Sequence, residues 1–121
     1  MPKENILLEK SLVFATRIVK LHKHLIKIHK EYIISKQIIR SGTSIGANIN
    51  EANYGSSIAD FINKMQIAQK ECAETEYWIR LLYSSDYLGE NEFNDILSDC
   101  QDLKNILTAS LKTAKKKTND K

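Results

Sequence analysis

The 121-residue chain has few of the residues that interrupt regular structure, with one proline and four glycines. Sheet proteins place such residues in their many turns, so this scarcity disfavours strands and favours helices. No apolar run approaches the roughly 18 residues that a membrane-spanning helix needs, and the first five residues lack the pattern of a secretory signal. We therefore expect an all-α protein of the cytoplasm, without a membrane segment.

Cysteine and histidine are also scarce, and their spacing matches no metal or redox motif. The two cysteines, Cys72 and Cys100, do not form a CxxC pair. His22 and His29 share a helix face while His24 points elsewhere, so no i,i+4 pair exists to hold zinc. The sequence predicts no metal and no cofactor, and it predicts two reduced cysteines at a similar height in the core.

Four stretches repeat apolar residues at alternating intervals of three and four, a spacing typical of amphipathic helices. The first series starts at Leu7, the second at Ile34, the third at Ile58 and the fourth at Phe93. The third series has one polar member, Thr75. Four further residues are expected to widen the apolar face of the first helix: Leu12, Ala15, Val19 and Ile26.

Short turn-forming segments separate these four series. The second series ends at Gly55, where a glycine in the left-handed conformation closes a helix. Ser57 and Asp60 then fit a new helix N-terminus as an S-x-x-D capping pattern. Because short loops make consecutive helices antiparallel neighbours, the sequence predicts an up-down-up-down antiparallel four-helix bundle over residues 1–114. The remaining residues, 115–121, contain nothing apolar and are expected to form a basic flexible tail.

The second predicted helix contains Gly42 and Gly46, and each glycine costs a helix about 1 kcal/mol relative to alanine. The two glycines are four residues apart, so they lie on one face, where small residues let another helix backbone approach closely. This spacing predicts close helix packing. A phosphate-binding P-loop is excluded because the glycine spacing is different and no strand precedes it.

A line of polar residues follows the same helix at successive turns: Arg40, Ser44, Asn48 and Glu51. On an antiparallel third helix, the residues level with Arg40 are Glu71 and Glu74. We expect Arg40 to pair with one of these glutamates, and Ser44 and Asn48 to extend the pair into a network that fixes helix register. General acid–base chemistry by a glutamate is the alternative, but no nucleophile or metal set accompanies it, and we assign no catalytic residue.

The net charge of +3 hides a strong separation of charge along the chain. Residues 10–40 carry eight basic side chains and one acidic side chain, whereas residues 81–103 carry six acidic and no basic ones. Basic residues of the first helix follow helical spacing away from its apolar stripe, so we expect an exposed basic ridge. This basic ridge consists of Arg17, Lys20, Lys23, Lys27 and Lys30.

Three interpretations of the basic ridge are open. In the first interpretation, the ridge is an ordinary solvated face, because lysines keep helices soluble. Alternatively, it contacts nucleic-acid phosphates, and the lysines of residues 115–117 add to an affinity that falls with salt. In the third interpretation it faces an acidic patch on a neighbouring subunit, a contact between unlike surfaces that can close a ring. The acidic patch consists of Asp86, Glu90, Glu92, Asp95, Asp99 and Asp102.

Aromatic residues gather around the end of the third predicted helix. They are Tyr77, Trp78, Tyr83 and Tyr87. We expect them to pack in the core or in a subunit interface, and a stacking platform for nucleic-acid bases is the alternative.

The segment 35–52, which reads SKQIIRSGTSIGANINEA, resembles the signature of the bacterial 23S rRNA intervening-sequence proteins. The resemblance continues through Asp60-Phe61, Lys70-Glu71, residues 74–82 and Tyr87-Leu88, and so covers nearly the whole chain. It implies a four-helix bundle that assembles as a ring-like homopentamer, and RNA binding is the customary suggestion for the family. Many relatives carry a glycine where this chain has Ala52, a departure that does not threaten the fold.

These patterns predict a non-enzymatic helical bundle that associates first with copies of itself and second with structured RNA or DNA. The alternative is a pure protein–protein interaction module that uses the basic ridge in subunit contacts. An enzyme of unknown type is a third class. No small-molecule substrate is evident from the sequence.

Overall fold

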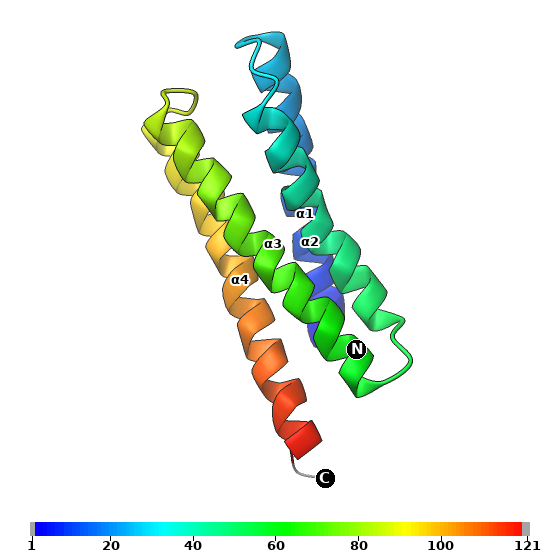
Figure 1. Cartoon of the computed structure of the whole chain (residues 1–121). Coiled ribbons are helices and arrows are strands. Elements are labelled where there is room, and N and C mark those ends of the chain that lie inside the picture. The colour runs from blue at the N-terminus through cyan, green and yellow to red at the C-terminus, as the bar shows by residue number, and fades with distance from the viewer. Residues whose placement is uncertain (1, 120–121) are drawn as a thin grey trace.

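The structure is a computed structural model, and it describes residues 2–119. Four helices account for most of this range, and no strand occurs within it. The helices are α1 (Pro2–Lys27), α2 (Ile34–Asn53), α3 (Ile58–Ser84) and α4 (Glu90–Asn119). They run alternately up and down (Figure 1), so the predicted antiparallel four-helix bundle is confirmed. None of the helices in the described range has the length and apolar character to cross a membrane.

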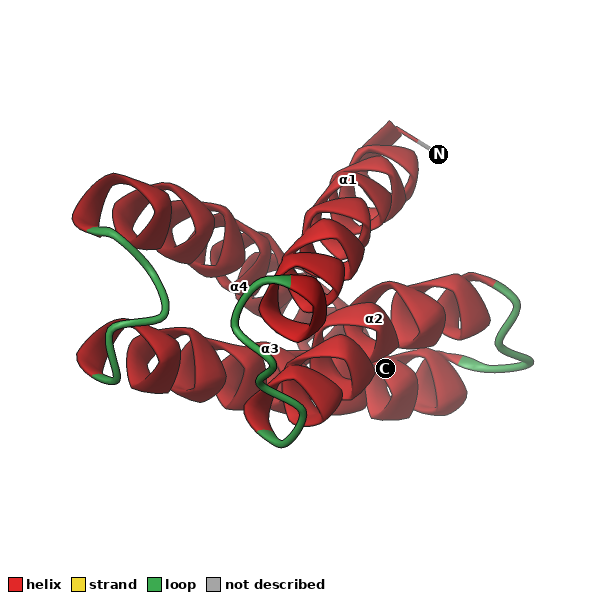
Figure 2. Ribbon diagram, turned by 90° about the horizontal axis from the view of Figure 1, so that it is seen from above, coloured by secondary structure: helices red, strands yellow, loops and turns green. Residues whose placement is uncertain are grey.

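Each helix packs against two others, and the α1–α4 seam is the least extensive of the four. Within residues 2–119, α1 does not contact α3 and α2 does not contact α4. The view along the bundle shows α1 and α3 on opposite sides (Figure 2). The outward faces of α1 and α3 therefore point away from each other.

The core consists mainly of the predicted apolar series. On α1, for example, Leu7, Phe14 and Ile18 are almost fully buried. The prediction that Leu12 widens the same face is wrong, because its side chain is 68% exposed. Leu12 follows Leu7 by five residues, which is about 140° around a helix, and this places it on the side of α1 away from the core. Ala15, Val19 and Ile26 are half-buried beside it.

The two glycines of α2 permit a close approach of α1, as predicted. A Cβ atom on Gly42 would lie 2.9 Å from side-chain carbons of Ile18, and one on Gly46 would lie 3.0 Å from Oγ of Ser11. Both neighbours belong to α1. The cost of glycine in a helix is thus offset by packing that a larger residue would prevent.

The turn between α2 and α3 confirms one prediction and corrects another. The amide of Asp60 donates to Oγ of Ser57 over 3.1 Å, so Ser57 caps α3 as the S-x-x-D pattern predicts. Gly55 does not adopt the left-handed conformation, since no glycine of residues 2–119 has a positive φ. A Cβ on Gly55 would instead lie 3.1 Å from the carbonyl oxygen of Ala52, so lack of space explains this glycine.

The N-terminus of α2 has a cap that sequence reasoning missed. The buried carboxylate of Glu31 accepts hydrogen bonds from the amides of Ile33, Ile34 and Ser35, at 2.8 to 3.1 Å. In return, Oγ of Ser35 donates to the carbonyl of Glu31 over 2.7 Å. This pairing satisfies backbone amides that a helix start leaves free. The glutamate and serine four residues apart were the available signal.

The C-terminal helix runs further than expected. Residues 115–119, assigned to a flexible tail, continue α4 to Asn119, and residues 120–121 lie outside the described range. Lysine is a good helix former, and basic side chains in the last turn interact favourably with the helix dipole. Oγ1 of Thr118 also donates to the carbonyl of Ala114 over 3.2 Å.

The two cysteines are free and buried, at the same level of the α3–α4 seam. Sγ of Cys100 lies 3.5 Å from the carbonyl oxygen of Cys72, which confirms the predicted proximity. The hydrogen-bonding contact with Cys100, together with burial, raises the pKa of the Cys72 thiol far above its usual range. Both effects disfavour the reactive thiolate.

Candidate functional site

The basic ridge divides into two parts in the structure. Lys20, Lys23, Lys27 and Lys30 are exposed, and none forms an ion pair with another residue of the described chain. We call these four residues the free ridge. The first three lie on α1, and Lys30 follows in the loop with a left-handed backbone, φ 55°. The free ridge is the candidate site.

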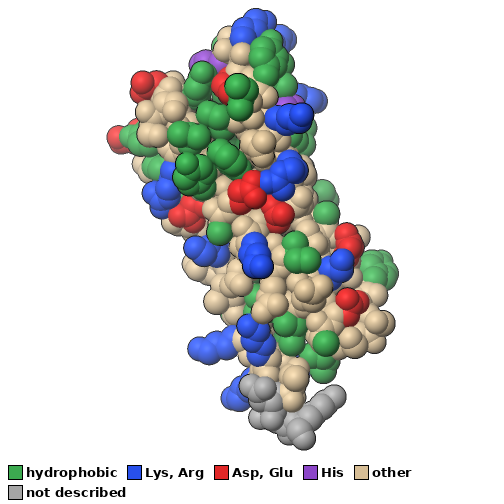
Figure 3. All heavy atoms as spheres, viewed as in Figure 1, with side chains coloured by type: hydrophobic (Ala, Val, Ile, Leu, Met, Phe, Trp, Pro, Cys, Tyr) green, Lys and Arg blue, Asp and Glu red, His purple; other side chains and the backbone are tan. Residues whose placement is uncertain are grey.

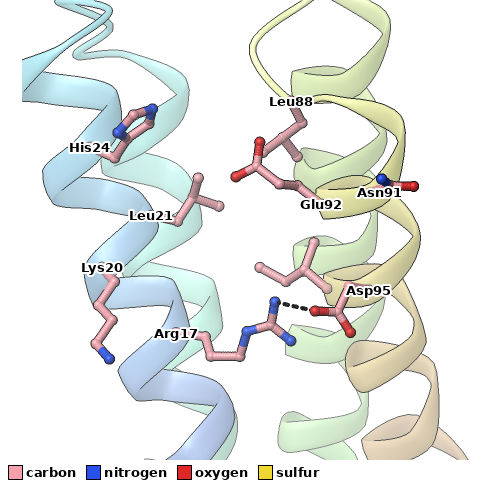
Figure 4. A pocket seen from close by; sticks show the side chains of 9 residues that line it. Arg17, Lys20, Leu21, His24, Leu88, Asn91, Glu92 and Asp95 are labelled. Carbon is pink, nitrogen blue, oxygen red and sulfur yellow. Dashed lines mark hydrogen bonds and ion pairs between the residues drawn. The ribbon is translucent and has the colours of Figure 1, made fainter.

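Arg17, the fifth predicted member, belongs to the α1–α4 seam instead. Its guanidinium donates to Oδ2 of Asp95 over 3.0 Å and to Oδ2 of Asp99 over 2.5 Å. Figure 4 shows the side chain extending from α1 across to Asp95 on α4. Lys10 bridges the same seam to Asp102 over 3.0 Å.

These pairs alter the interpretation of the acidic patch. Three of its six members, Asp95, Asp99 and Asp102, are held by cations of their own chain. Asp86, Glu90 and Glu92 form no ion pair with the side chains of residues 6–119. The carboxylates that remain for a neighbouring subunit thus lie at the start of α4 and in the loop before it.

A cavity of about 500 Å³ lies between α1 and α4 beside the free ridge. Leu21 points into it from α1 and Leu88 from the loop before α4, and the carboxylate of Glu92 reaches toward α1 (Figure 4). His24 lies at one end and the Arg17–Asp95 pair at the other. The cavity shows that the α1–α4 seam is incompletely filled.

The predicted polar pair is present between α2 and α3. Arg40 donates to Oε1 of Glu71 over 3.3 Å and to Oε2 of Glu74. The indole of Trp78 donates to the same Oε2 of Glu74 over 3.0 Å. The Trp78 hydrogen bond, followed by the bond and charge of Arg40, holds the pKa of Glu74 below its usual value, and Glu74 in turn raises the pKa of Arg40.

The rest of the expected polar network is not connected to this pair. Oγ of Ser44 donates to the carbonyl of Arg40 over 2.8 Å, and Nδ2 of Asn48 donates to the carbonyl of Ser44 over 2.8 Å, so both stabilise their own helix. Glu51 pairs with Lys64 over 3.0 Å. The network is therefore smaller than predicted, because short side chains reach the carbonyl one turn back before they reach a partner helix.

The histidines lie differently from the sequence expectation. The rings of His24 and His29 are 5.2 Å apart, and His29 also contacts the ring of Tyr87 at 5.4 Å. The expectation that His24 points away from His29 is wrong because α1 ends at Lys27 and the chain turns back. No group of three metal-ligating side chains occurs in the part of the chain that the structure describes.

Two of the four predicted aromatic residues are half-buried and contact rings of other segments, one stacked and one edge-on. Tyr83 stacks on Phe93 with ring centres 4.1 Å apart, and Tyr87 contacts His29. Tyr77 remains 59% exposed on the outward face of α3, with its ring 5.1 Å from that of Trp78. Tyr77 is thus the most exposed of these four aromatic residues.

The fold and its charges define a small antiparallel four-helix bundle with an exposed line of lysines. The model of the 23S rRNA-intervening sequence protein family matches residues 3–109. The chain therefore belongs to this family. A search of curated proteins gives no match.

A solved structure agrees with this assignment. The chain is similar to a protein with unknown function from the S23 ribosomal protein family of Bacteroides thetaiotaomicron VPI-5482, known from a crystal structure. The two are 49% identical, with a TM-score of 0.90, and the match covers 91% of this chain and 98% of the other.

Proposed function

We propose that this chain is a non-enzymatic, homo-oligomeric scaffold of the cytoplasm that binds structured RNA or other nucleic acid through its free ridge. The observation that carries the nucleic-acid half is the set of four exposed lysines with no ion pair in the described chain. Their charge is not used within the bundle. An unneutralised line of lysines suits the phosphate backbone of a polyanion.

The spacing of the lysines supports this choice. Lys20 and Lys27 are two helical turns apart, about 10 Å at 1.5 Å per residue. Side chains at this spacing reach several phosphates of one strand. If four lysines each displace a counterion, log affinity falls against log salt with a slope of about −3.6 for duplex. The family description refers to 23S rRNA, which favours RNA as the polyanion.

The self-association half of the proposal is supported by the exposed apolar surface of α1. Ile6, Leu12 and Val13 of α1 are 50%, 68% and 63% exposed, and large apolar side chains that gather on one exposed element are typical of interaction surfaces. A ring-like homopentamer is the assembly that the family resemblance implies, and we include it in the proposal. The alternative function is an interaction module without nucleic acid, in which the free ridge serves subunit contacts.

Binding of a fluorescein-labelled RNA hairpin, measured by fluorescence anisotropy over a range of salt, tests the nucleic-acid half. The variant K20E/K23E/K27E should abolish binding. The control K36E/K70E/K112E changes the net charge equally at exposed lysines outside the ridge and should weaken binding far less. Equal losses in both variants, or a ridge variant with unchanged affinity, would overturn the assignment of the ridge.

Sedimentation velocity of the same proteins without RNA tests the self-association half of the proposal. The wild-type chain should sediment as an oligomer, and the ridge variant should remain one. Loss of the oligomer in K20E/K23E/K27E would favour the interaction module, and a monomeric wild type would refute the scaffold.

A further inference from the structure

Three aromatic rings lie in contact beside the free ridge, at the end of the bundle where α1 and α2 are joined. The ring centre of His24 is 5.2 Å from that of His29, which is 5.4 Å from that of Tyr87. We call these three rings the ring cluster. They come from α1, from the loop after it and from the loop before α4, so the fold brings together segments that are far apart in the sequence.

His24 shares its helix face with the free ridge. At about 100° per residue, its side chain is about 40° around α1 from that of Lys20 and about 60° from that of Lys27. Along the helix axis it lies between these two lysines, about 6 Å from Lys20 at 1.5 Å per residue. The ring cluster therefore begins among the lysines and extends from them toward the loop before α4.

The contacts within the ring cluster leave ring faces open. Both contacts are edge-on, with interplanar angles of 74° and 90°, so each covers a face of only one ring. His24 and His29 are exposed, and Tyr87 is half-buried. Exposed histidine and tyrosine rings are surfaces on which unpaired nucleic-acid bases stack.

The loop between α1 and α2 adds exposed apolar side chains and positive charge. Ile28, Tyr32 and Ile33 are 60%, 56% and 78% exposed, and Lys30 lies among them. Glu31, the one acidic residue of this loop, is buried, and its carboxylate accepts bonds from amides at the start of α2. At the upper end of the molecule in Figure 3, histidine, lysine and hydrophobic side chains lie together on the surface. Aromatic groups within a positive surface suit single-stranded nucleotides.

Carboxylates on the α4 side restrict how a strand can lie here. Asp86 precedes Tyr87 in the chain, and Glu92 lines the cavity beside His24. Neither is neutralised by an ion pair with the side chains of residues 6–119, so both would repel phosphate. A bound strand would keep its phosphates on the lysines of α1 and turn its bases toward the ring cluster. Bases in an uninterrupted duplex are paired and stacked on each other, so only unpaired bases can turn in this way.

We propose that the ring cluster is a stacking site for unpaired bases, so that the chain binds RNA with unpaired nucleotides more tightly than uninterrupted duplex. This inference rests on the nucleic-acid half of the proposed function and names the class of RNA that the free ridge holds.

Two fluorescein-labelled RNA probes test this proposal by fluorescence anisotropy at one salt concentration. Both contain the same duplex with a short single-stranded overhang. In one probe the overhang consists of adenosines, and in the other it consists of abasic nucleotides. The phosphates are equal in number, so the probes differ only in the bases that can stack. The wild-type chain should bind the adenosine overhang about ten-fold more tightly, as expected when a base stacks on an aromatic side chain.

Three variants identify the residues responsible. H24A/H29A should lose the preference and bind both probes as the wild type binds the abasic one. H24F/H29F retains two aromatic rings and should keep the preference. H22A is the matched control, because His22 lies on the same helix but contacts the carbonyl of Ser35, and it should also keep the preference. Circular dichroism checks that each variant is folded.

The outcomes separate this inference from the proposed function. Equal affinity of the wild type for both probes, or a preference that H24A/H29A retains, would overturn the stacking site. The free ridge would still stand if K20E/K23E/K27E abolishes binding. Loss of the preference in H24F/H29F would show that the imidazoles act by charge or hydrogen bonding, and would also overturn stacking. A wild-type chain that binds neither probe would overturn the nucleic-acid half of the proposed function as well.

Discussion

Ser41 of α2 and Thr75 of α3 share a hydrogen bond of 2.8 Å between their hydroxyl oxygens, and both residues are fully buried. Oγ1 of Thr75 also lies 2.7 Å from the carbonyl oxygen of Glu71, so one threonine hydroxyl serves both contacts. This pair explains the one polar position in the predicted apolar series of α3. It also joins two helices within a mainly apolar core.

Removing one member of this pair should cost more than removing both. T75V leaves the buried Ser41 hydroxyl without its partner, and we expect a loss of about 1–3 kcal/mol in the free energy of unfolding. In S41A/T75V no polar group is stranded, so the loss should be smaller. Urea unfolding of the wild type, S41A, T75V and S41A/T75V gives the coupling energy between the two hydroxyl groups. Additive losses would contradict the pairing.

Gly42→Ala should destabilise the bundle although alanine favours helices. The new Cβ would meet side-chain carbons of Ile18 at 2.9 Å, and overpacking of this kind costs about 1–3 kcal/mol. Combining it with Ile18→Ala removes those carbons, so the double variant should lose less than the sum of the single losses, as measured by urea unfolding. A more stable Gly42→Ala protein would show that α1 moves away without cost.

Glu31→Ala should weaken the start of α2. The carboxylate of Glu31 accepts three backbone hydrogen bonds, and loss of a helix cap costs about 0.5–2 kcal/mol. Hydrogen exchange should rise first at the amides of Ile34 and Ser35. The control Glu90→Ala removes an exposed glutamate in the first turn of α4 and should change stability less. Similar losses would contradict the capping role.

The ion pair between Arg40 and Glu74 should contribute to the free energy of unfolding in a pH-dependent way. Because its pKa is lowered in the folded chain, the contribution is present above the unfolded pKa of about 4.3 and is lost as pH falls through the folded pKa. The wild type should therefore exceed Glu74→Gln by less than about 1 kcal/mol at pH 7, since the side chain is partly exposed. Thermal unfolding from pH 7 to pH 3 should show this difference shrinking, and a constant difference would argue against it.

The cysteines should be inert in the folded protein. The hydrogen-bonding contact with Cys100 and burial raise the pKa of Cys72, so a thiol reagent such as dithionitrobenzoate at pH 8 should react only as the chain unfolds. Two thiols per chain should then appear in denaturant. Rapid reaction of the native protein would show that the α3–α4 seam opens.

Periodicity was sufficient to predict the four helices and most of the core, because each apolar series repeats over many turns. It failed at Leu12, since a wide apolar face and two separate stripes give nearly the same spacing. Only the position of neighbouring helices decides which side of α1 is covered. The close approach of another helix at Gly42 and Gly46 was predictable from spacing. Two glycines one turn apart destabilise a helix unless a close neighbour requires them.

The charges were less predictable than the helices. Helical spacing placed Arg17 and Lys20 on one ridge, although only Lys20 is free. Arg17 is drawn to Asp95 and Asp99, whose height on α4 depends on the length of the α3–α4 loop. The pairing of Arg40 was correct because the short turn after α2 fixes which residues of α3 lie beside it.

The ion pairs of Lys10 and Arg17 lie on the least extensive seam of the bundle. Dissolved ions screen such exposed pairs but leave apolar packing intact. Raising the salt concentration therefore weakens the contact of α4 with α1 more than the contact of α2 with α1, so the spacing of these two terminal helices responds to the ionic composition of the surroundings.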